Sequence, residues 1–113
     1  MQIIIPNYRA KSRNKTITSH WRVYQKYRDE IAELIFAYSK DRSVIFPAKV
    51  TITAYFKGKR AIDTSNLDAK TILDGLMGSG ILEDDTCIHN PEVILRVIAE
   101  SGKDELVILV EKC

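Results

Sequence analysis

Residues 50–56 run Val50-Thr51-Ile52-Thr53-Ala54-Tyr55-Phe56, and apolar side chains occupy every second position. Alternation with a period of two places one set of side chains on one face of a strand and the other set on the opposite face. We therefore predict a half-buried β-strand here. It follows Pro47, which ends whatever precedes it, and it leads directly into the basic turn Gly58-Lys59-Arg60.

Upstream of this strand, an amphipathic helix is expected. Apolar and aromatic side chains recur in steps of three and four, which places them on one stripe of a helix. They are Trp21, Tyr24, Tyr27, Ile31, Leu34, Ile35 and Tyr38. We interpret this stripe as core rather than as a platform for stacking bases. Thr18 or Ser19 would supply the N-cap, and a short strand, Ile3-Ile4-Ile5, precedes a polar and basic loop.

Downstream, a second helix is expected from about Ser65 to Met77, ended by Gly78-Ser79-Gly80. Two apolar runs, 93–99 and 106–110, then flank a turn at 101–104 and predict a β-hairpin. The order of elements is β-α-β-α-β-β. We therefore predict an α+β fold in a single domain, residues 1–113, with a small mixed β-sheet packed on two helices.

The composition excludes several classes of protein. Of 113 residues, 45% are hydrophobic and 28% are charged, as is typical of a globular domain. No apolar run is long enough to span a membrane or to act as a secretory leader, so we expect neither. The cysteines, Cys87 and Cys113, form no CxxC pair, which favours a reducing cytoplasm. The glycine spacing fits no P-loop or dinucleotide-binding pattern, so no nucleotide cofactor is expected.

Charge is distributed unevenly along the chain, although the net charge is only +2. Residues 1–60 carry 13 basic and 4 acidic side chains, a net charge of +9. Residues 61–113 carry 4 basic and 11 acidic side chains, a net charge of −7. This division indicates a basic surface for a polyanion beside an acidic pocket for cations. The alternative is that both are solvated faces of a small domain.

Four carboxylates form the candidate chemical site: Asp63 and Asp68 near the start of the second helix, and Asp84 and Asp85 in the loop after it. If they meet, their repulsion requires a cation, and hard carboxylate oxygens favour Mg²⁺, with Mn²⁺ as a substitute. Each acid also has a simpler explanation. Asp63 would begin a turn, Asp84 and Asp85 would be solvated, and Asp68 would belong to a capping box begun by Ser65.

A longer pattern surrounds these acids: Asp63-Thr64-Ser65-Asn66-Leu67, then Lys70, then Leu73-Asp74-Gly75-Leu76, then Gly80 and Asp84-Asp85. This pattern resembles the RusA family of Holliday junction resolvases. Members of that family are Mg²⁺-dependent endodeoxyribonucleases of bacteria and their phages, and they are dimeric. Their length, basic N-terminal portion, order of elements and closing strand hairpin are similar to those expected here.

The resemblance implies roles for individual residues. Asp63 would be the first metal-binding carboxylate, Asp84-Asp85 would supply the late ones, and Lys70 would be a lysine needed for cleavage. Two features depart from the family pattern. Ser65 stands where a second Asp is expected, and one extra residue separates Asn66 from Lys70.

A hydroxyl binds Mg²⁺ far more weakly than a carboxylate does. One alternative is that Asp68 supplies the carboxylate that Ser65 lacks. The others are that the site uses fewer protein ligands and more waters, or that activity is reduced. Lys70 also has the alternative role of a helical ion pair with Asp74, four residues later.

The activity implied by the resemblance is metal-dependent hydrolysis of DNA phosphodiesters at a four-way junction. The metal would polarise the scissile phosphate and activate a water, and Lys70 would counter the charge that develops on the phosphate oxygens. A homodimer would place one site at each of two equivalent strands. Because of Ser65, the alternative is a non-cleaving junction-binding module of the same fold. The expected DNA contacts are Arg9, Lys11, Arg13, Lys15, Lys59, Arg60 and Asn66.

Overall fold

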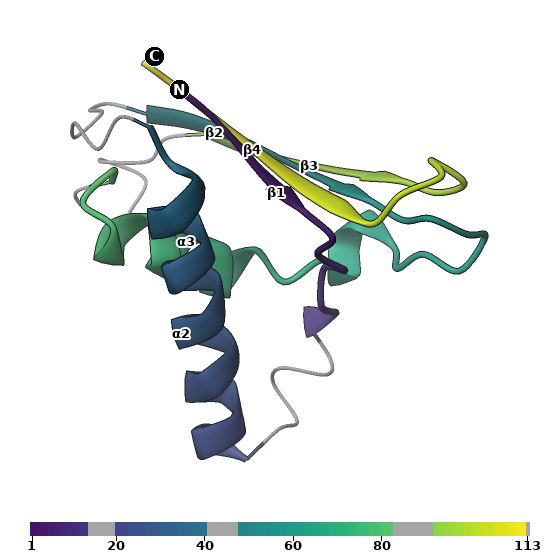
Figure 1. Cartoon of the computed structure of the whole chain (residues 1–113), viewed down its shortest axis with the longest axis horizontal. Coiled ribbons are helices and arrows are strands. Elements are labelled where there is room, and N and C mark those ends of the chain that lie inside the picture. Colours follow the sequence, from purple (N-terminus) through teal and green to yellow (C-terminus); the bar gives the residue numbers. More distant parts are fainter. Residues whose placement is uncertain (14–19, 41–47, 83–91, 113) are drawn as a thin grey trace.

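The computed structural model describes residues 1–13, 20–40, 48–82 and 92–112. The predicted α+β class and the order β-α-β-α-β-β are confirmed. Helices α2 and α3 lie on the same face of the sheet (Figure 1). The elements are strand β1 (Gln2–Pro6), helix α2 (Trp21–Tyr38), strand β2 (Ala48–Tyr55), the 3₁₀ turn η1 (Thr64–Asn66), helix α3 (Ala69–Gly78), strand β3 (Glu92–Ile98) and strand β4 (Glu105–Lys112).

The four strands form one mixed sheet in the order β1-β4-β2-β3. β2 pairs antiparallel with β4 and parallel with β3, so Ile52 lies opposite Ile108 on one side and Leu95 on the other. β1 forms an edge of the sheet by pairing antiparallel with β4. The strand that alternates most clearly in the sequence is therefore an inner strand with a neighbour on each side.

The predicted hairpin between the last two strands is wrong, because β2 lies between β3 and β4. Adjacent strands lie about 4.8 Å apart, so the connection must span roughly twice that distance. Residues 99–104 make this crossing over the end of β2. The amide of Ser101 donates to the carbonyl oxygen of Phe56 (3.0 Å), and that of Glu100 donates to Gly58 (2.9 Å). The apolar runs predicted the strands but not their pairing.

The core lies between the sheet and the two helices. Alternate side chains of β2, namely Val50, Ile52 and Ala54, are fully buried, as the period of two predicts. One apolar cluster joins the sheet to the helices, so α3 and the segment before it are fixed against the sheet. Its members from the other elements include Ile3, Ile5, Leu106, Ile108 and Val110 from β1 and β4, and Ile31, Ile35, Ile72 and Leu76 from α2 and α3.

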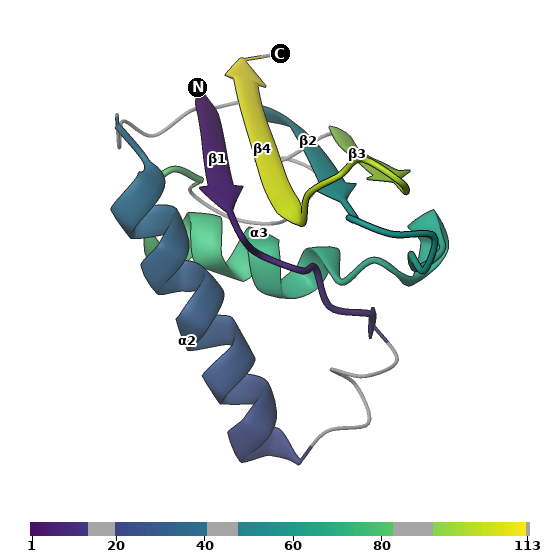
Figure 2. The same cartoon turned by 45° about the vertical axis from the view of Figure 1, so that its right-hand side comes forward.

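Helix α2 covers the whole predicted stripe, from Trp21 to Tyr38, but this stripe is only partly core. Ile31 and Ile35 are buried, whereas Trp21 is 59% exposed and Tyr38 is also exposed. A helix of this length extends about 27 Å, and its N-terminal end projects away from the sheet in Figures 1 and 2. The sheet therefore covers only the C-terminal half of α2, which explains why Trp21 is exposed. The assignment of Trp21 and Tyr38 to the core is wrong.

The N-cap of α2 is His20, not Thr18 or Ser19 as predicted. Its ring nitrogen Nδ1 accepts a hydrogen bond from the amide of Arg22 (3.3 Å). A histidine ring nitrogen can act as the capping acceptor in place of a hydroxyl oxygen. The hydroxyl side chains that precede His20 are therefore not required for this role.

Helices α2 and α3 approach each other closely at Gly75. A Cβ atom there would lie 2.9 Å from Cδ1 of Ile35 and 3.4 Å from Cα of Ala32. The absence of a side chain at Gly75 therefore provides the space in which the two helices cross.

Among the described residues, no helix is both long and apolar enough to cross a membrane.

Candidate active site

The segment between β2 and α3 carries Asp63 at the start of the turn η1. The amide of Asn66 donates to the main-chain carbonyl oxygen of Asp63 (2.9 Å), which closes the turn. The carboxylate of Asp63 makes no capping hydrogen bond to η1, and the residue is exposed. The prediction that Asp63 begins a turn is confirmed, and its side chain faces solvent.

Asp68 lies in a different environment. It is only 4% exposed and is the N-cap residue of α3. Its Oδ2 accepts a hydrogen bond of 2.8 Å from the hydroxyl of Thr71, and its Oδ1 accepts a longer one of 3.5 Å from the amide of the same residue. The carboxylate therefore has a structural partner at the helix start, as the capping explanation requires.

The capping box predicted from Ser65 is wrong, because α3 begins at Ala69. The chain first makes η1 and then becomes extended at Leu67 (φ −68°, ψ 128°). At that residue it forms an isolated β-bridge with Ser12. The bridge keeps the backbone out of helical geometry until Asp68, so the cap falls three residues later than expected.

Lys70 and Asp74 form the expected ion pair on α3. Nζ of Lys70 lies 3.5 Å from Oδ1 of Asp74, and the Lys70 side chain is 64% exposed. The hydroxyl of Tyr24 on α2 interacts electrostatically with the same groups. Its pKa is raised by burial and by the negative charges of Asp74 and Asp68, against a lowering by Lys70. Lys70 is therefore a surface ammonium in an acidic environment near the start of α3.

Asp84 and Asp85 lie outside the described residues, so their meeting with Asp63 stays a prediction. Helix α3 ends shortly before them in the sequence. Gly80 has a positive φ of 78°, and the amides of the next two residues donate to the carbonyl oxygen of Leu76 (3.0 and 3.3 Å). Among the described residues, no three His, Cys, Asp or Glu side chains are grouped as a metal site. A complete metal site would therefore need a late carboxylate in addition to Asp63.

Residues 8–12, which we call the N-terminal strap, lie against the segment between β2 and α3. Nη2 of Arg9 donates to the carbonyl oxygen of Arg60 (2.8 Å). The amide of Asp68 donates to the carbonyl oxygen of Lys11 (3.2 Å). With the β-bridge described above, these bonds tie the strap to both ends of the segment that carries the first carboxylate.

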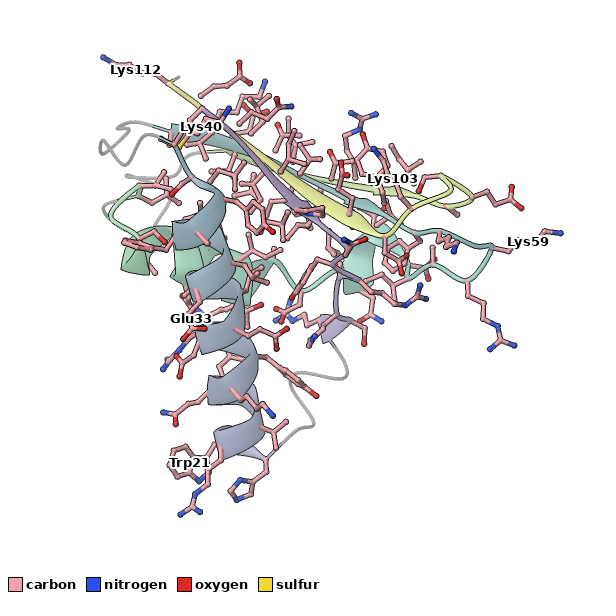
Figure 3. All side chains as sticks on the ribbon, in the orientation of Figure 1. Trp21, Glu33, Lys40, Lys59, Lys103 and Lys112 are labelled. Carbon is pink, nitrogen blue, oxygen red and sulfur yellow. The ribbon has the colours of Figure 1, made fainter. Side chains whose placement is uncertain are left out.

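The predicted DNA contacts lie in different environments. Lys59 and Arg60 are exposed in the turn after β2, and Lys59 projects from the molecule in Figure 3. The ammonium of Lys11 lies 4.8 Å from the ring centroid of Tyr27 and 5.4 Å from that of Tyr8, so its charge already contacts two aromatic faces. Of the others, Arg13 is exposed, Asn66 is half-buried and Lys15 lies outside the described residues.

Arg9 is held by three different groups. Besides its bond to Arg60, its guanidinium lies 4.8 Å from the ring centroid of Phe56 and 3.6 Å from Oδ1 of Asp104. Its side chain nevertheless remains 52% exposed. Arg9 is therefore both a link within the fold and a cation at the surface.

Tyr8, the first residue of the strap, is packed against charged neighbours. Burial, together with the negative charges of Glu30 and Asp68, raises the pKa of its hydroxyl from 10.0 to about 12. The phenol therefore stays neutral at physiological pH and contributes no charge to the site.

Lys57 and Lys103 are basic residues that the sequence did not single out. Together with Arg9 and other residues they line a hollow of about 360 Å³. Lys103 lies in residues 61–113, which are acidic overall. Counting charge separately before and after residue 60 therefore does not assign Lys103 to the basic surface. Only the crossing of residues 99–104 over the end of β2 brings Lys103 beside Lys57.

Two relatives place these residues in a family. The chain is 30% identical over 84 residues to the crossover junction endodeoxyribonuclease of Enterobacteria phage 82. The aligned residues make up 74% of this chain and 69% of that protein. The same identity and coverage hold for the RusA crossover junction endodeoxyribonuclease of Escherichia coli K12. This chain belongs to the RusA family. No protein-family model matches it.

The RusA-like segment Leu73-Asp74-Gly75-Leu76 now has a structural explanation. Asp74 pairs with Lys70, Gly75 admits helix α2, and Leu76 is fully buried in the core. This part of the RusA pattern therefore holds α3 in place and orients Lys70 at the surface.

Proposed function

We propose that this protein is a metal-dependent endonuclease that resolves four-way DNA junctions. The observation that carries the proposal is the exposed Asp63, which lies in the sequence between the basic turn Lys59–Arg60 and the helix that bears Lys70. The relatives of this chain are named as crossover junction endodeoxyribonucleases. An acid that can hold a cation, beside cations that can hold phosphates, is the combination that phosphodiester hydrolysis needs.

Mg²⁺ is the proposed cofactor, with Mn²⁺ as a substitute. The donor chemistry fits, because Asp63 offers hard oxygens that face solvent and are not engaged in a cap. Asp84 and Asp85 would complete the set of ligands. We assign Asp68 to the cap of α3 instead, since Thr71 hydrogen-bonds to both of its oxygens. When bound, the metal polarises the scissile phosphate and lowers the pKa of an attacking water.

Lys70 would stabilise the negative charge that develops on the phosphate oxygens. Its ammonium is exposed, and the 3.5 Å pair with Asp74 orients it along α3. A preorganised hydrogen-bond donor aimed at a developing negative charge typically contributes a factor of about 10² to 10³ in rate. The ion pair and the catalytic role are therefore compatible rather than alternatives.

The basic surface would hold the phosphate backbone. Such contacts carry no sequence information directly, so junction shape rather than base identity should dominate recognition. The constrained guanidinium of Arg9 and the exposed turn after β2 are the best placed of these groups. The proposed contacts are Arg9, Lys11, Arg13, Lys15, Lys59, Arg60 and Asn66.

We also propose that the protein acts as a homodimer. A four-way junction offers two equivalent strands, and two-fold symmetry would give each strand one site. Analytical ultracentrifugation of the protein with and without a junction measures this directly. A dimer at micromolar concentration is expected, and a 1:1 complex of one protomer per junction would contradict it.

Ser65 favours a second candidate function, a module that binds junctions without cutting them. The residue stands where the family pattern has an acid, and a hydroxyl is a weak Mg²⁺ ligand. Cleavage by the wild-type protein in Mg²⁺ or Mn²⁺ would exclude this second candidate.

Asp63→Asn and Asp85→Asn test the proposed function. Each change keeps the size of the side chain but removes a negative charge that a metal needs. Nicking of an end-labelled junction and binding of the same junction are measured in parallel. We expect both variants to lose cutting and to keep their junction affinity. Unchanged cutting in both variants would contradict the proposal.

A further inference from the structure

A hollow lies at the end of the sheet where β2 stops and β4 begins. Its volume is about 360 Å³. Three separate parts of the chain meet there: the residues after β1, those after β2, and the turn before β4. Figure 3 shows Lys103 and Lys59 toward the same side of the molecule and Lys112 at the opposite side. We call this hollow the turn pocket; its lining is Asn7, Arg9, Lys57, Gly102, Lys103 and Asp104.

The acid in this lining, Asp104, is engaged with protein groups. Its Oδ1 accepts a hydrogen bond of 2.8 Å from the amide of Lys57 and lies 3.6 Å from Nη1 of Arg9. Its main-chain oxygen accepts from the amide of Tyr8 (3.2 Å). Asp104 thus holds the three parts of the chain together, and its charge is compensated within the protein. Arg9 therefore offsets part of the repulsion that Asp104 would exert on an anion.

Arg9 is preorganised at the wall of the turn pocket. The ring of Phe56 lies 4.8 Å from its guanidinium carbon, and the carbonyl oxygen of Arg60 accepts from Nη2 at 2.8 Å. Stacking and hydrogen bonding fix the plane of the guanidinium while the side chain stays half-exposed. A planar guanidinium has five N–H donors, so it can bind a phosphate while keeping its internal partners.

The turn pocket carries an excess of positive charge. Nζ of Lys103 lies 5.3 Å from the ring centroid of Tyr55 and 3.3 Å from Glu105, which limits the positions of its ammonium. The three cations of the turn pocket outnumber the two carboxylates of the pocket and its rim. The cations are Arg9, Lys57 and Lys103, and the carboxylates are Asp104 and Glu105. The exposed basic turn after β2 adds to this field. A pocket of this kind suits a group with concentrated negative charge.

A second hollow adjoins the turn pocket, because Arg9 lines both. Its volume is about 310 Å³, and Ile62, the residue before Asp63, lies in its wall. A nucleic acid strand seated in the turn pocket could therefore continue past Arg9 to Asp63. The remaining lining consists of Ala10, Lys11 and Ser12 of the N-terminal strap.

We infer that the turn pocket binds a backbone phosphate of the DNA strand that is cut at Asp63, on a nucleotide that flanks the scissile bond. This inference rests on the proposed function. A phosphate held there fixes the strand at a set distance from the candidate active site. The pocket would thereby determine which phosphodiester reaches Asp63, with Lys57 and Lys103 as its positioning cations.

The test compares Lys57→Ala, the double variant Lys57→Ala/Lys103→Ala and the matched control Lys112→Ala. Lys112 ends the same strand that Lys103 precedes, at the opposite side of the molecule. Fluorescence anisotropy of a labelled four-way junction in EDTA gives the affinity over a series of salt concentrations. The slope of log K against log salt is negative, and each lost phosphate contact should reduce its magnitude by about 0.9. Lys112→Ala should keep the wild-type slope.

The single variant keeps the Lys103–Glu105 ion pair, and a thermal melt of each variant checks that the fold is intact. A reduced slope and weaker binding in the Lys57 and Lys103 variants, with a wild-type Lys112→Ala, would support the inference. If the wild type cuts junctions while all variants keep its slope, the inference is overturned and the proposed function stands. If the wild type binds no junction at all, both are overturned.

Discussion

Oδ2 of Asp68 and the hydroxyl of Thr71 form a buried hydrogen bond of 2.8 Å at the start of α3. Asp63, five residues earlier, is exposed and caps nothing with its side chain. Two acids that are equivalent candidates in the sequence therefore differ in their surroundings. Asp68 caps the start of α3, and Asp63 faces solvent three residues after a basic turn.

Asp68→Ala should lower the free energy of unfolding by about 1 to 3 kcal/mol, because it removes an N-cap and leaves the buried Thr71 hydroxyl without its acceptor. Asp63→Ala should change it by less than about 0.5 kcal/mol, as expected at an exposed position. Urea denaturation measures both. Equal losses of stability in the two variants would contradict the division of roles.

Gly75→Val should destabilise the protein by about 1 to 3 kcal/mol, since its Cβ would lie 2.9 Å from Cδ1 of Ile35 at the helix crossing. Gly78→Ala is the matched control at the end of the same helix, where a Cβ would meet no atom within 4 Å. That change should be neutral or slightly stabilising. A wild-type urea midpoint for Gly75→Val would show that α2 and α3 do not cross as described.

The raised pKa of Tyr8, about 12 against an ordinary 10.0, makes stability depend on pH in the alkaline range. Between these values the unfolded chain has released the phenolic proton and the folded protein keeps it, so the free energy of unfolding falls as pH rises. The contribution is complete below pH 10 and decreases toward pH 12, by roughly 2 to 3 kcal/mol.

Tyr8→Phe should remove this part of the pH dependence, and Tyr38→Phe, at an exposed position on α2, should not. Urea midpoints of the three proteins across the alkaline range measure the difference. Parallel curves for wild type and Tyr8→Phe would rule out the buried environment described for Tyr8.

Lys70→Ala should reduce the rate of junction cutting by about 10² to 10³ while leaving stability nearly unchanged, because the side chain is 64% exposed. Lys40→Ala, at an exposed lysine just after α2, serves as the control and should cut at the wild-type rate. Single-turnover kinetics with a pre-bound junction separate the rate of cutting from binding. A loss of affinity with an unchanged rate would make Lys70 a DNA contact only.

Local patterns in the sequence predicted most of the fold. The alternation at Val50, Ile52 and Ala54 identified a buried strand face, and the stripe from Trp21 to Tyr38 identified a helix. Pairing was not predictable in the same way, because apolar runs on either side of a turn favour a hairpin whether or not another strand lies between them. The exposure of Trp21 likewise depends on how far the sheet extends, which periodicity does not encode.

The sequence names candidate site residues, but it does not predict the environments in which the described ones lie. An N-cap and a metal ligand require the same carboxylate, so the sequence left both roles open for Asp68. The bridge between Ser12 and Leu67 set where α3 begins and thereby decided the cap. The gathering of Lys57 and Lys103 depends on contacts between residues 47 positions apart, such as that from Lys57 to Asp104, and no local pattern reports those.

The central claim is that this chain cuts four-way DNA junctions with a metal held partly by Asp63. The most direct measurement incubates the wild-type protein with an end-labelled four-way junction and a matched linear duplex, in Mg²⁺ or in EDTA. We expect paired symmetric nicks on the junction alone, lost in EDTA. Tight junction binding without nicks in either Mg²⁺ or Mn²⁺ would contradict the claim.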